Sequence, residues 1–395
     1  MLVKQIATLV NNTTREIDGS IALLNEDLSN VVEVGQSLEN ASGFDNYVRT
    51  LPDMVGRMVF VDRKYSGGAP NILVDAWEYG SIMAKYRSRM PEATENESWE
   101  LEDGVSYDMS IFTKPYASAK FFNKKVTFEI PLSITERQVK ESFHSAEQLN
   151  AFISMLYNEV DKSMTVKLDS LIMRTINNFA AETIFDGVGS DLGDTSVRAV
   201  NLLKLYNDTF TPSTALTAEK AIYDKDFIRF AVYTMGKYRD YMSRISTVFN
   251  MGGTEKFTPA EHLKTVLLSD FAKAAGVYLY DANGQFRTEN LGLGEFESVP
   301  FWQGSGTSFA FDDLSTIKVT TVDGHSVECS GILGVMFDRD ACVVCNKDRR
   351  VTTAPYNAKA EFWNQWHKWD CQYLNDFDEN FVVFFIHDDD DEDVS

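Results

Sequence analysis

The clearest pattern along the chain is a helical repeat of apolar residues between positions 145 and 183. Ser145 followed by Gln148 matches a capping box, which satisfies the first free N–H groups of a helix. No glycine or proline interrupts the repeat before Gly187. The spacing predicts one amphipathic helix of about 38 residues, about 57 Å long. Packing across a sheet fits this pattern better, and a coiled-coil dimer is the weaker alternative. Its buried stripe consists of Leu149, Phe152, Leu156, Val160, Met164, Leu168, Leu171, Ile172, Ile176 and Phe179.

The segment before this helix predicts a long two-stranded hairpin with a charged tip. Val126–Ile130 alternates apolar and polar residues, as a half-buried strand does. A polar stretch rich in arginine and glutamate, from Arg87 to Asp103, precedes the return of the chain through Phe121 and Phe122. A projecting hairpin of this kind is marginally stable alone in water, so it needs a partner surface.

The first 60 residues predict short helices joined by polar turns. Each helix has only a small apolar face, and such faces cannot build an independent core. The helices must therefore pack on other parts of this chain or on a neighbouring one. The two faces are Ile6, Leu9 and Val10, and then Tyr47, Leu51, Met54, Val55 and Met58.

The C-terminal half mixes helices and strands, so we predict the α+β class. Between 187 and 330 the expected helices are Asp226–Met242 and one that starts at Thr258 and Pro259. The face of the second helix is Leu263, Val266, Leu267 and Phe271. The expected strands there are Val277–Tyr280, Phe296–Phe301, Ile317–Thr321 and one from Val327. Further strands are expected at Ile332–Phe337, Ala341–Cys345, the aromatic stretch Phe362–Leu374 and Phe381–Ile386, followed by a solvated acidic tail.

Charge and hydropathy narrow the function. Lys and Arg total 37 against 59 Asp and Glu, a formal net charge of -22. Proteins that hold DNA over a broad surface normally carry the opposite sign, because phosphate neutralisation supplies most of the non-specific affinity. We find neither a membrane span nor a secretory signal, and therefore expect a cytoplasmic protein with reduced thiols and no membrane partner.

Candidate chemistry is sparse. Cys342 and Cys345 form a C-x-x-C pair, and Cys329, His367 and Cys371 could complete a zinc or redox site. Residues three apart on a strand point to opposite faces, which argues against this site. Phosphate-binding, nucleophile-elbow and zinc-helix motifs are missing. We expect no catalytic residues, no metal site and no cofactor; the alternative is a cytosolic α/β metal-dependent or hydrolytic enzyme that uses the Cys342–Cys371 region.

The order of segments resembles the coat protein fold of tailed bacteriophages, the Hong Kong ninety-seven fold. An arm precedes a charged hairpin, a long helix, a mixed α/β region and closing strands. The residues at Phe44–Phe60, Phe121–Ser142, 145–183 and Gly331–Phe385 are most similar to coat proteins of small, short-tailed phages of the Bacillus podovirus group. The resemblance implies a major capsid protein that builds an icosahedral shell of hexamers and pentamers around a double-stranded DNA genome. Another virion component, such as a portal or tail protein, is the further alternative.

The resemblance also implies a division of the chain and a set of partners. Residues 1–60 correspond to the arm, 61–135 to the extended loop, 136–186 and 331–386 to the peripheral domain, 187–330 to the axial domain and 387–395 to a disordered tail. Partners would be other copies of the chain, a scaffolding protein, a portal, and enclosed DNA bound without sequence specificity, all assembled in the host cytoplasm. The expected subunit contacts in the hairpin are Arg87, Arg89, Glu95, Trp99, Phe121 and Phe122.

Overall fold

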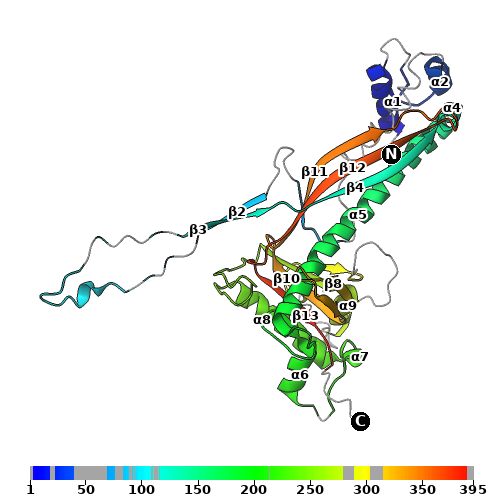
Figure 1. The fold of residues 1–395 in the computed structure, drawn as a ribbon. Coiled ribbons are helices and arrows are strands. Elements are labelled where there is room, and N and C mark those ends of the chain that lie inside the picture. The colour runs from blue at the N-terminus through cyan, green and yellow to red at the C-terminus, as the bar shows by residue number, and fades with distance from the viewer. Residues whose placement is uncertain are drawn as a thin grey trace. The chain divides into compact units, whose positions relative to one another are not determined.

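The computed structural model describes residues 3–17, 23–39, 69–75, 83–88, 91, 93, 95–107, 110, 114, 116–212, 214–278, 289–302 and 315–388. The chain divides into two compact units (Figure 1). The first unit is Met1–Glu78, Lys125–Met173 and Val344–Gln372, and the second is Tyr79–Lys124, Arg174–Val343 and Tyr373–Ser395. Each unit contains both helices and a sheet, which confirms the α+β class.

The predicted long helix is confirmed as α5 (Ala146–Val188), which has 43 residues. At its start, the Ser145 hydroxyl accepts a hydrogen bond from the backbone N–H of Gln148 at 3.2 Å, as the capping pattern requires. All ten residues of the predicted stripe are buried. The helix ends beside Gly189, whose φ of 67° suits a glycine and whose N–H reaches the Phe185 carbonyl at 2.9 Å. Within the described ranges, no helix has the length and apolar character of a membrane span.

The first unit is built on a four-stranded sheet in the order β1 (Leu73–Asp75), β11 (Cys342–Thr353), β12 (Phe362–Asn375) and β4 (Lys125–Thr135). β1 is parallel to β11, and β12 is antiparallel to β4. From Ile130 to Ile134, alternate residues of β4 are buried, as are the residues of β12 that lie opposite them. This alternation gives the sheet one buried face and confirms the strand predicted at Val126–Ile130.

Short helices cover part of this unit's core. They are α1 (Val3–Ile17), α2 (Val31–Glu39) and α4 (Glu136–Ser142). Val10 of α1 and Val34 of α2 are fully buried in a cluster that also contains Ile153 of α5 and Trp363 of β12. Val10, the member of the first predicted apolar face whose burial the structure describes, therefore packs on other parts of the same chain. The second predicted face, at residues 47–58, lies outside the described residues.

The second unit is built on a five-stranded sheet in the order β5 (Ala199–Asn201), β13 (Phe381–Phe385), β10 (Ile332–Asp338), β6 (Leu263–Leu268) and β7 (Glu297–Val299). Every residue of β10 and β13 is buried, which explains their unbroken apolar runs. Phe179 of α5 stacks on Phe381 with ring centroids 4.1 Å apart. The other elements here are α6 (Leu202–Phe210), α7 (Ala218–Ala221), α8 (Lys225–Met242), α9 (Ser269–Tyr278), the short 3-10 helix η2 (Glu289–Gly292), and the paired strands β8 (Ile317–Thr320) and β9 (Ser326–Cys329).

Two predictions between residues 258 and 280 are wrong. Residues 263–268 form strand β6 instead of the helix that the Thr258-Pro259 pair predicts. The Thr258 hydroxyl donates a hydrogen bond to Asp338 Oδ2 at 2.9 Å instead of capping a helix, and β6 pairs along its length with buried β10. Conversely, Val277 and Tyr278 end helix α9 where a strand is expected. Apolar spacing in short segments fits either element, and pairing with the sheet decides.

The strands of residues 331–386 are divided between the two sheets. β10 and β13 lie in the five-stranded sheet, whereas β11 and β12 contribute to the four-stranded sheet. The prediction from sequence assigns these strands to one domain because they are neighbours along the chain. A hydrophobic run shows that a strand is buried but does not identify the strand with which it pairs.

Candidate assembly surface and its anchor

The predicted hairpin contains a short antiparallel ribbon in the second unit. β2 (Met83–Ser88) pairs with β3 (Ala117–Phe122), and Lys85 lies directly opposite Lys120. Residues that lie opposite one another, or two apart on one strand, share a face of a ribbon. Lys85, Arg87 and Lys120 therefore lie on the same face. Three cations placed side by side repel one another, so this face requires anions.

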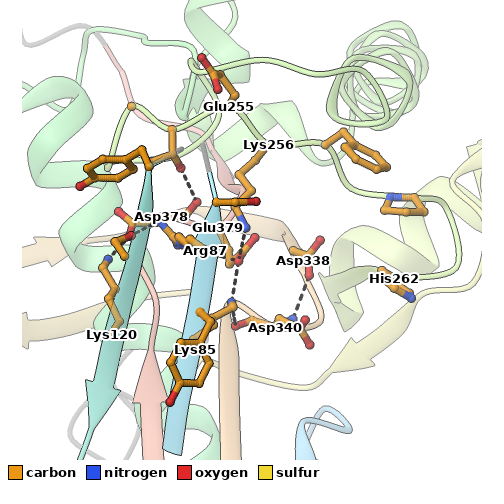
Figure 2. Close-up of a pocket in the computed structure, with 18 residues that line it drawn as sticks. Lys85, Arg87, Lys120, Glu255, Lys256, His262, Asp338, Asp340, Asp378 and Glu379 are labelled. Carbon is orange, nitrogen blue, oxygen red and sulfur yellow. Dashed lines mark hydrogen bonds and ion pairs between the residues drawn. The ribbon is translucent and has the colours of Figure 1, made fainter. Parts of the chain in front are cut away.

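The turn between β12 and β13 supplies those anions. Asp376, Asp378 and Glu379 are all buried. Lys85 Nζ lies 3.0 Å from Asp376 Oδ2 and 2.6 Å from Glu379 Oε1. Arg87 Nη2 lies 3.1 Å from Asp376 Oδ2. Arg87 also pairs with Asp378 (Figure 2). The base of the hairpin is thus bound by ion pairs to a turn almost 300 residues further along the chain.

Two more lysines complete this group. Lys120 Nζ lies 3.3 Å from Asp376 Oδ1 and also pairs with Asp378, while Lys256 Nζ lies 2.8 Å from Glu379 Oε1. We call the group the anchor cluster. Its members are Lys85, Arg87, Lys120, Lys256, Asp376, Asp378 and Glu379.

The anchor cluster depends on a close backbone approach at Gly252. The Gly252 N–H donates a hydrogen bond to the Phe377 carbonyl at 3.0 Å. A Cβ atom at Gly252 would overlap the carboxylate of Asp378. Glycine is therefore required here for Asp378 to reach Arg87 and Lys120.

The electrostatics of the cluster follow from burial and from the paired charges. Burial raises the pKa of Asp376, but the nearby charges of Lys85, Lys120 and Arg87 outweigh burial and hold it below its ordinary value of 3.8. Burial lowers the pKa of Lys85, but Glu379 and Asp376 raise it further, so its net shift is upward from 10.5. The stabilisation from Asp376 is present above pH 3.8 and is lost as the pH falls through its lowered pKa. The stabilisation from Lys85 is present below pH 10.5 and is lost as the pH rises through its raised pKa.

Beyond the anchor, the hairpin residues whose burial the structure describes are exposed. Residues 95–107 include the 3-10 turn η1 (Glu97–Trp99). Trp99 is 95% exposed, and Leu101, Val105 and Tyr107 are also exposed. Apolar side chains in this setting normally become covered by a partner. The hairpin is thus held to the chain at its base, while the apolar side chains of its tip remain exposed. This arrangement is typical of a surface that contacts a partner.

A groove of about 1040 Å³ runs along the base of the hairpin (Figure 2). Asp338 lines it, where Oδ2 accepts the hydrogen bond from Thr258 and Oδ1 accepts one from the Asp340 N–H at 2.9 Å. Burial raises the pKa of Asp338 above its ordinary value. Lys85 Nζ also reaches the Asp340 carbonyl at 3.4 Å. These contacts extend the anchor to the end of strand β10.

The four cysteines lie in the hydrophobic core. All four are buried, and none of them forms a disulfide. Burial raises the pKa of Cys329 to about 12 and that of Cys342 well above its ordinary value. Zinc binds the thiolate, which these surroundings disfavour. Within the described part of the chain, no cluster of three histidine, cysteine or acidic side chains is arranged to hold a metal ion.

The residues predicted to contact a neighbouring subunit have different surroundings. Arg87 is engaged by acids of its own chain. Glu95 and Trp99 are exposed in the tip; Phe121 is 63% exposed, and Phe122 is half-buried at the end of β3. Arg89 lies outside the described residues. Their contact with another subunit stays a prediction.

Sequence reasoning did not find the acidic half of the anchor cluster. Asp376, Asp378 and Glu379 stand in a short turn between two strongly apolar strands, where acids have few local partners. Three acids in such a turn are a signal that cations must approach from elsewhere, because buried carboxylates are paired. The pattern does not say which cations these are.

Comparison with known proteins identifies the class. A family model described as Phi29-like phage major capsid protein matches residues 7–385. The match covers most of the chain, so the protein is a structural component of phage capsids and belongs to the Phi29-like phage major capsid protein family. No curated protein matches the sequence.

Solved structures of phage capsids are also similar. The capsid structure of Staphylococcus phage Andhra aligns at 10% identity over 82% of this chain and 86% of its own, with a TM-score of 0.49. The capsid structure of cyanophage P-SCSP1u aligns at 9% identity over 83% and 92%, with a TM-score of 0.48. The asymmetric unit of the mature capsid of bacteriophage PhiM1 aligns at 10% identity over 82% and 87%, with a TM-score of 0.43. The family match, rather than these alignments, establishes the class.

Family membership fixes the general function. The chain assembles with copies of itself into a capsid shell and resides in the virion. A capsid family describes a structural protein, which disfavours the alternative of a metal-dependent or hydrolytic enzyme. The exposed hairpin tip and its anchor are therefore parts of an assembling subunit.

Proposed function

We propose that copies of this chain form hexameric and pentameric rings that close into an icosahedral shell around a double-stranded DNA genome, in a short-tailed phage of the Bacillus podovirus-like group. The supporting observation is the hairpin, which is held at its base by the anchor cluster and leaves Trp99 and its apolar neighbours exposed. The tip would lie on a neighbouring subunit and bury surface that a single copy leaves open. Stable contacts of this kind bury about 2,000 Å² or more.

The parts of the chain would take distinct roles in the shell. Residues 1–60 would form the arm, 61–135 the extended loop, and 136–186 with the strands β11 and β12 the peripheral domain. Residues 187–330 would form the axial domain around the centre of each ring, and we add β10 and β13 to it because they share the sheet with β5, β6 and β7. The acidic segment 387–395 would form the solvated tail.

The partners would be a scaffolding protein during assembly, a portal at one vertex, and enclosed DNA that is not read by sequence. A net charge of -22 supports the last point, because an acidic chain can enclose a polyanion without adhering to it. Assembly would take place in the cytoplasm of the bacterial host.

The role of the hairpin is tested by shortening it above the anchor. Residues 91–114 are replaced by a short glycine-serine turn, which keeps β2, β3 and all seven members of the anchor cluster. A second variant replaces the same residues with a glycine-serine segment of equal length, which removes the side chains of the tip, Trp99 included, without shortening the hairpin. Both variants should remain folded by circular dichroism but form no closed particles by electron microscopy.

The wild-type chain, expressed with and without its genomic neighbours, provides the reference. Closed shells or curved sheets of rings support the proposal, and dispersed wild-type monomers or isolated rings of about a dozen subunits, the size of a portal, contradict it. If wild-type shells form and the shortened variants also yield particles of normal size, the hairpin does not make the proposed contact.

A further inference from the structure

A second uncovered surface lies on α8, away from the hairpin. Tyr233, Lys237 and Tyr241 recur on one side of this helix and are exposed, with Tyr233 66% exposed. Lys237 Nζ lies 5.8 Å from the Tyr233 ring and 5.9 Å from the Tyr241 ring, so the three side chains form one stack. The opposite side of α8 is buried through residues such as Phe227 and Met235. The helix therefore has a core face and, opposite it, an aromatic face.

The aromatic face continues beyond the helix. Phe230, one turn before Tyr233, lies 5.7 Å ring to ring from Phe210 of α6, which is 57% exposed. Just past the end of α8, Ile245 is 55% exposed. We call this surface the α8 patch, and its members are Phe210, Phe230, Tyr233, Lys237, Tyr241 and Ile245. Tyrosine and phenylalanine gathered around a cation are typical of the centre of a protein interface, where they supply much of the binding energy.

We propose that the α8 patch binds a second copy of this chain, as the contact between neighbouring subunits of one ring. The inference rests on the proposed function, since a ring requires a heterologous contact in which two different surfaces of the same chain meet. The α8 patch is one of these surfaces.

Charge indicates where the neighbouring copy makes contact. The exposed face of α8 and the residues just after it carry Arg229, Lys237 and Arg244 against Asp226 and Asp240, so the surface is slightly cationic in a chain of net charge -22. A cationic aromatic surface fits an acidic one.

The second unit offers such an acidic surface beside its edge strand. A groove of about 770 Å³ next to β7 is lined by Glu261, Glu295 and Glu297, against Arg239 and Lys264. Arg239 projects from α8 on the side away from Lys237, so the groove and the α8 patch are separate surfaces of one unit. A chain with both surfaces can bind one copy on each side, which every ring requires.

The first test removes the aromatic rings. In Tyr233→Ser/Tyr241→Ser the stack around Lys237 is lost, whereas Tyr233→Phe/Tyr241→Phe keeps both rings and serves as the matched control. Because the two side chains are exposed, neither variant should alter the melting temperature of the unassembled subunit. We expect the serine variant to form particles at a yield at least about tenfold below wild type, and the phenylalanine variant to stay close to wild type.

The second test shows what covers the patch. All four native cysteines are buried, so Tyr233→Cys places a single accessible thiol on the surface. In particles assembled from the purified chain alone, maleimide labelling of Cys at this position should be at least about tenfold slower than in dissociated subunits. Equal labelling rates, or normal particle yield from the serine variant, would overturn the proposal. If labelling slows only after a scaffolding protein is added, the proposal is also rejected, and the α8 patch is a binding site for the scaffolding protein instead. If the wild type forms no particles at all, the proposed function has failed rather than this inference.

Discussion

Replacing Arg87 by alanine isolates the contribution of the anchor cluster. The Arg87 side chain is 13% exposed, and it faces Asp376, which is fully buried, and Asp378. Removing one partner of a fully buried ion pair costs about 3–5 kcal/mol, because the other charge is left without compensation. Lys85 and Lys120 still lie 3.0 and 3.3 Å from Asp376 in this variant. The loss should therefore be smaller, about 2–3 kcal/mol of local stability.

The loss should be concentrated in the ribbon of β2 and β3, which can be measured by hydrogen exchange on the unassembled subunit. Amides whose exchange requires the ribbon to open should exchange about 30 to 150 times faster, since each 1.36 kcal/mol corresponds to a factor of ten. Amides in the middle of α5 should be unaffected.

Arg137→Ala serves as the matched control, because Arg137 pairs with Glu141 at 2.6 Å on an exposed helix surface. Exposed pairs contribute little, so exchange in this variant should match wild type throughout. The reasoning is refuted if Arg87→Ala leaves exchange in β2 and β3 unchanged, or if the whole second unit loses protection equally.

Three further outcomes are expected. His367 on β12 is 1% exposed, and neither ring nitrogen has a hydrogen-bond partner in the described part of the chain; burial lowers its pKa to about 4. The free energy of unfolding is undiminished by this histidine above pH 6.5 and falls by about 3 kcal/mol as the pH drops towards 4, because only the unfolded chain binds the proton readily. Urea denaturation of His367→Leu should therefore show a flatter pH dependence across that interval than wild type. An unchanged slope contradicts this. Gly331 has a φ of 72°, and a Cβ there would overlap the Ile386 carbonyl. Gly331→Ala should therefore destabilise the subunit by more than about 1 kcal/mol in thermal melts. An unaltered melt would show that the backbone after β13 can move aside without cost. The purified native chain should contain no stoichiometric zinc, and its buried thiols, Cys342 included, should react with a thiol reagent only after denaturation; rapid reaction of the folded chain would mean that a cysteine is accessible.

The long helix was predictable because its signal is local and repeated. The ten buried residues of the predicted stripe, from Leu149 to Phe179, recur every three to four positions, so an error at one position does not change the conclusion. The cap at Ser145 adds independent evidence for the start. By contrast, Leu263–Leu268 is too short for its spacing to distinguish a helix from a strand, and its pairing with β10 depends on residues about 70 positions away.

The anchor cluster could be predicted only in part. Arg87 was identifiable as a charged residue of the hairpin, but its partners Asp376 and Asp378 lie almost 300 residues further along the chain. A single sequence carries no information on which distant charges meet. The α8 patch illustrates a different limit, because Tyr233 and Tyr241 match the helical period of the segment, yet the sequence does not reveal which aromatic residues remain uncovered once the core is filled.

The indole of Trp99 gives the hairpin tip an optical signal of its own. The chain has six tryptophans, and the structure describes five of them: Trp302, Trp363 and Trp369 are at most 2% exposed, Trp366 is half-buried and Trp99 is 95% exposed. Acrylamide should therefore quench Trp99 more strongly than the other four. When a surface closes over the tip, emission from Trp99 should shift to the blue and its quenching should fall. Subunit association can thus be followed in real time, by stopped flow, without attaching a dye.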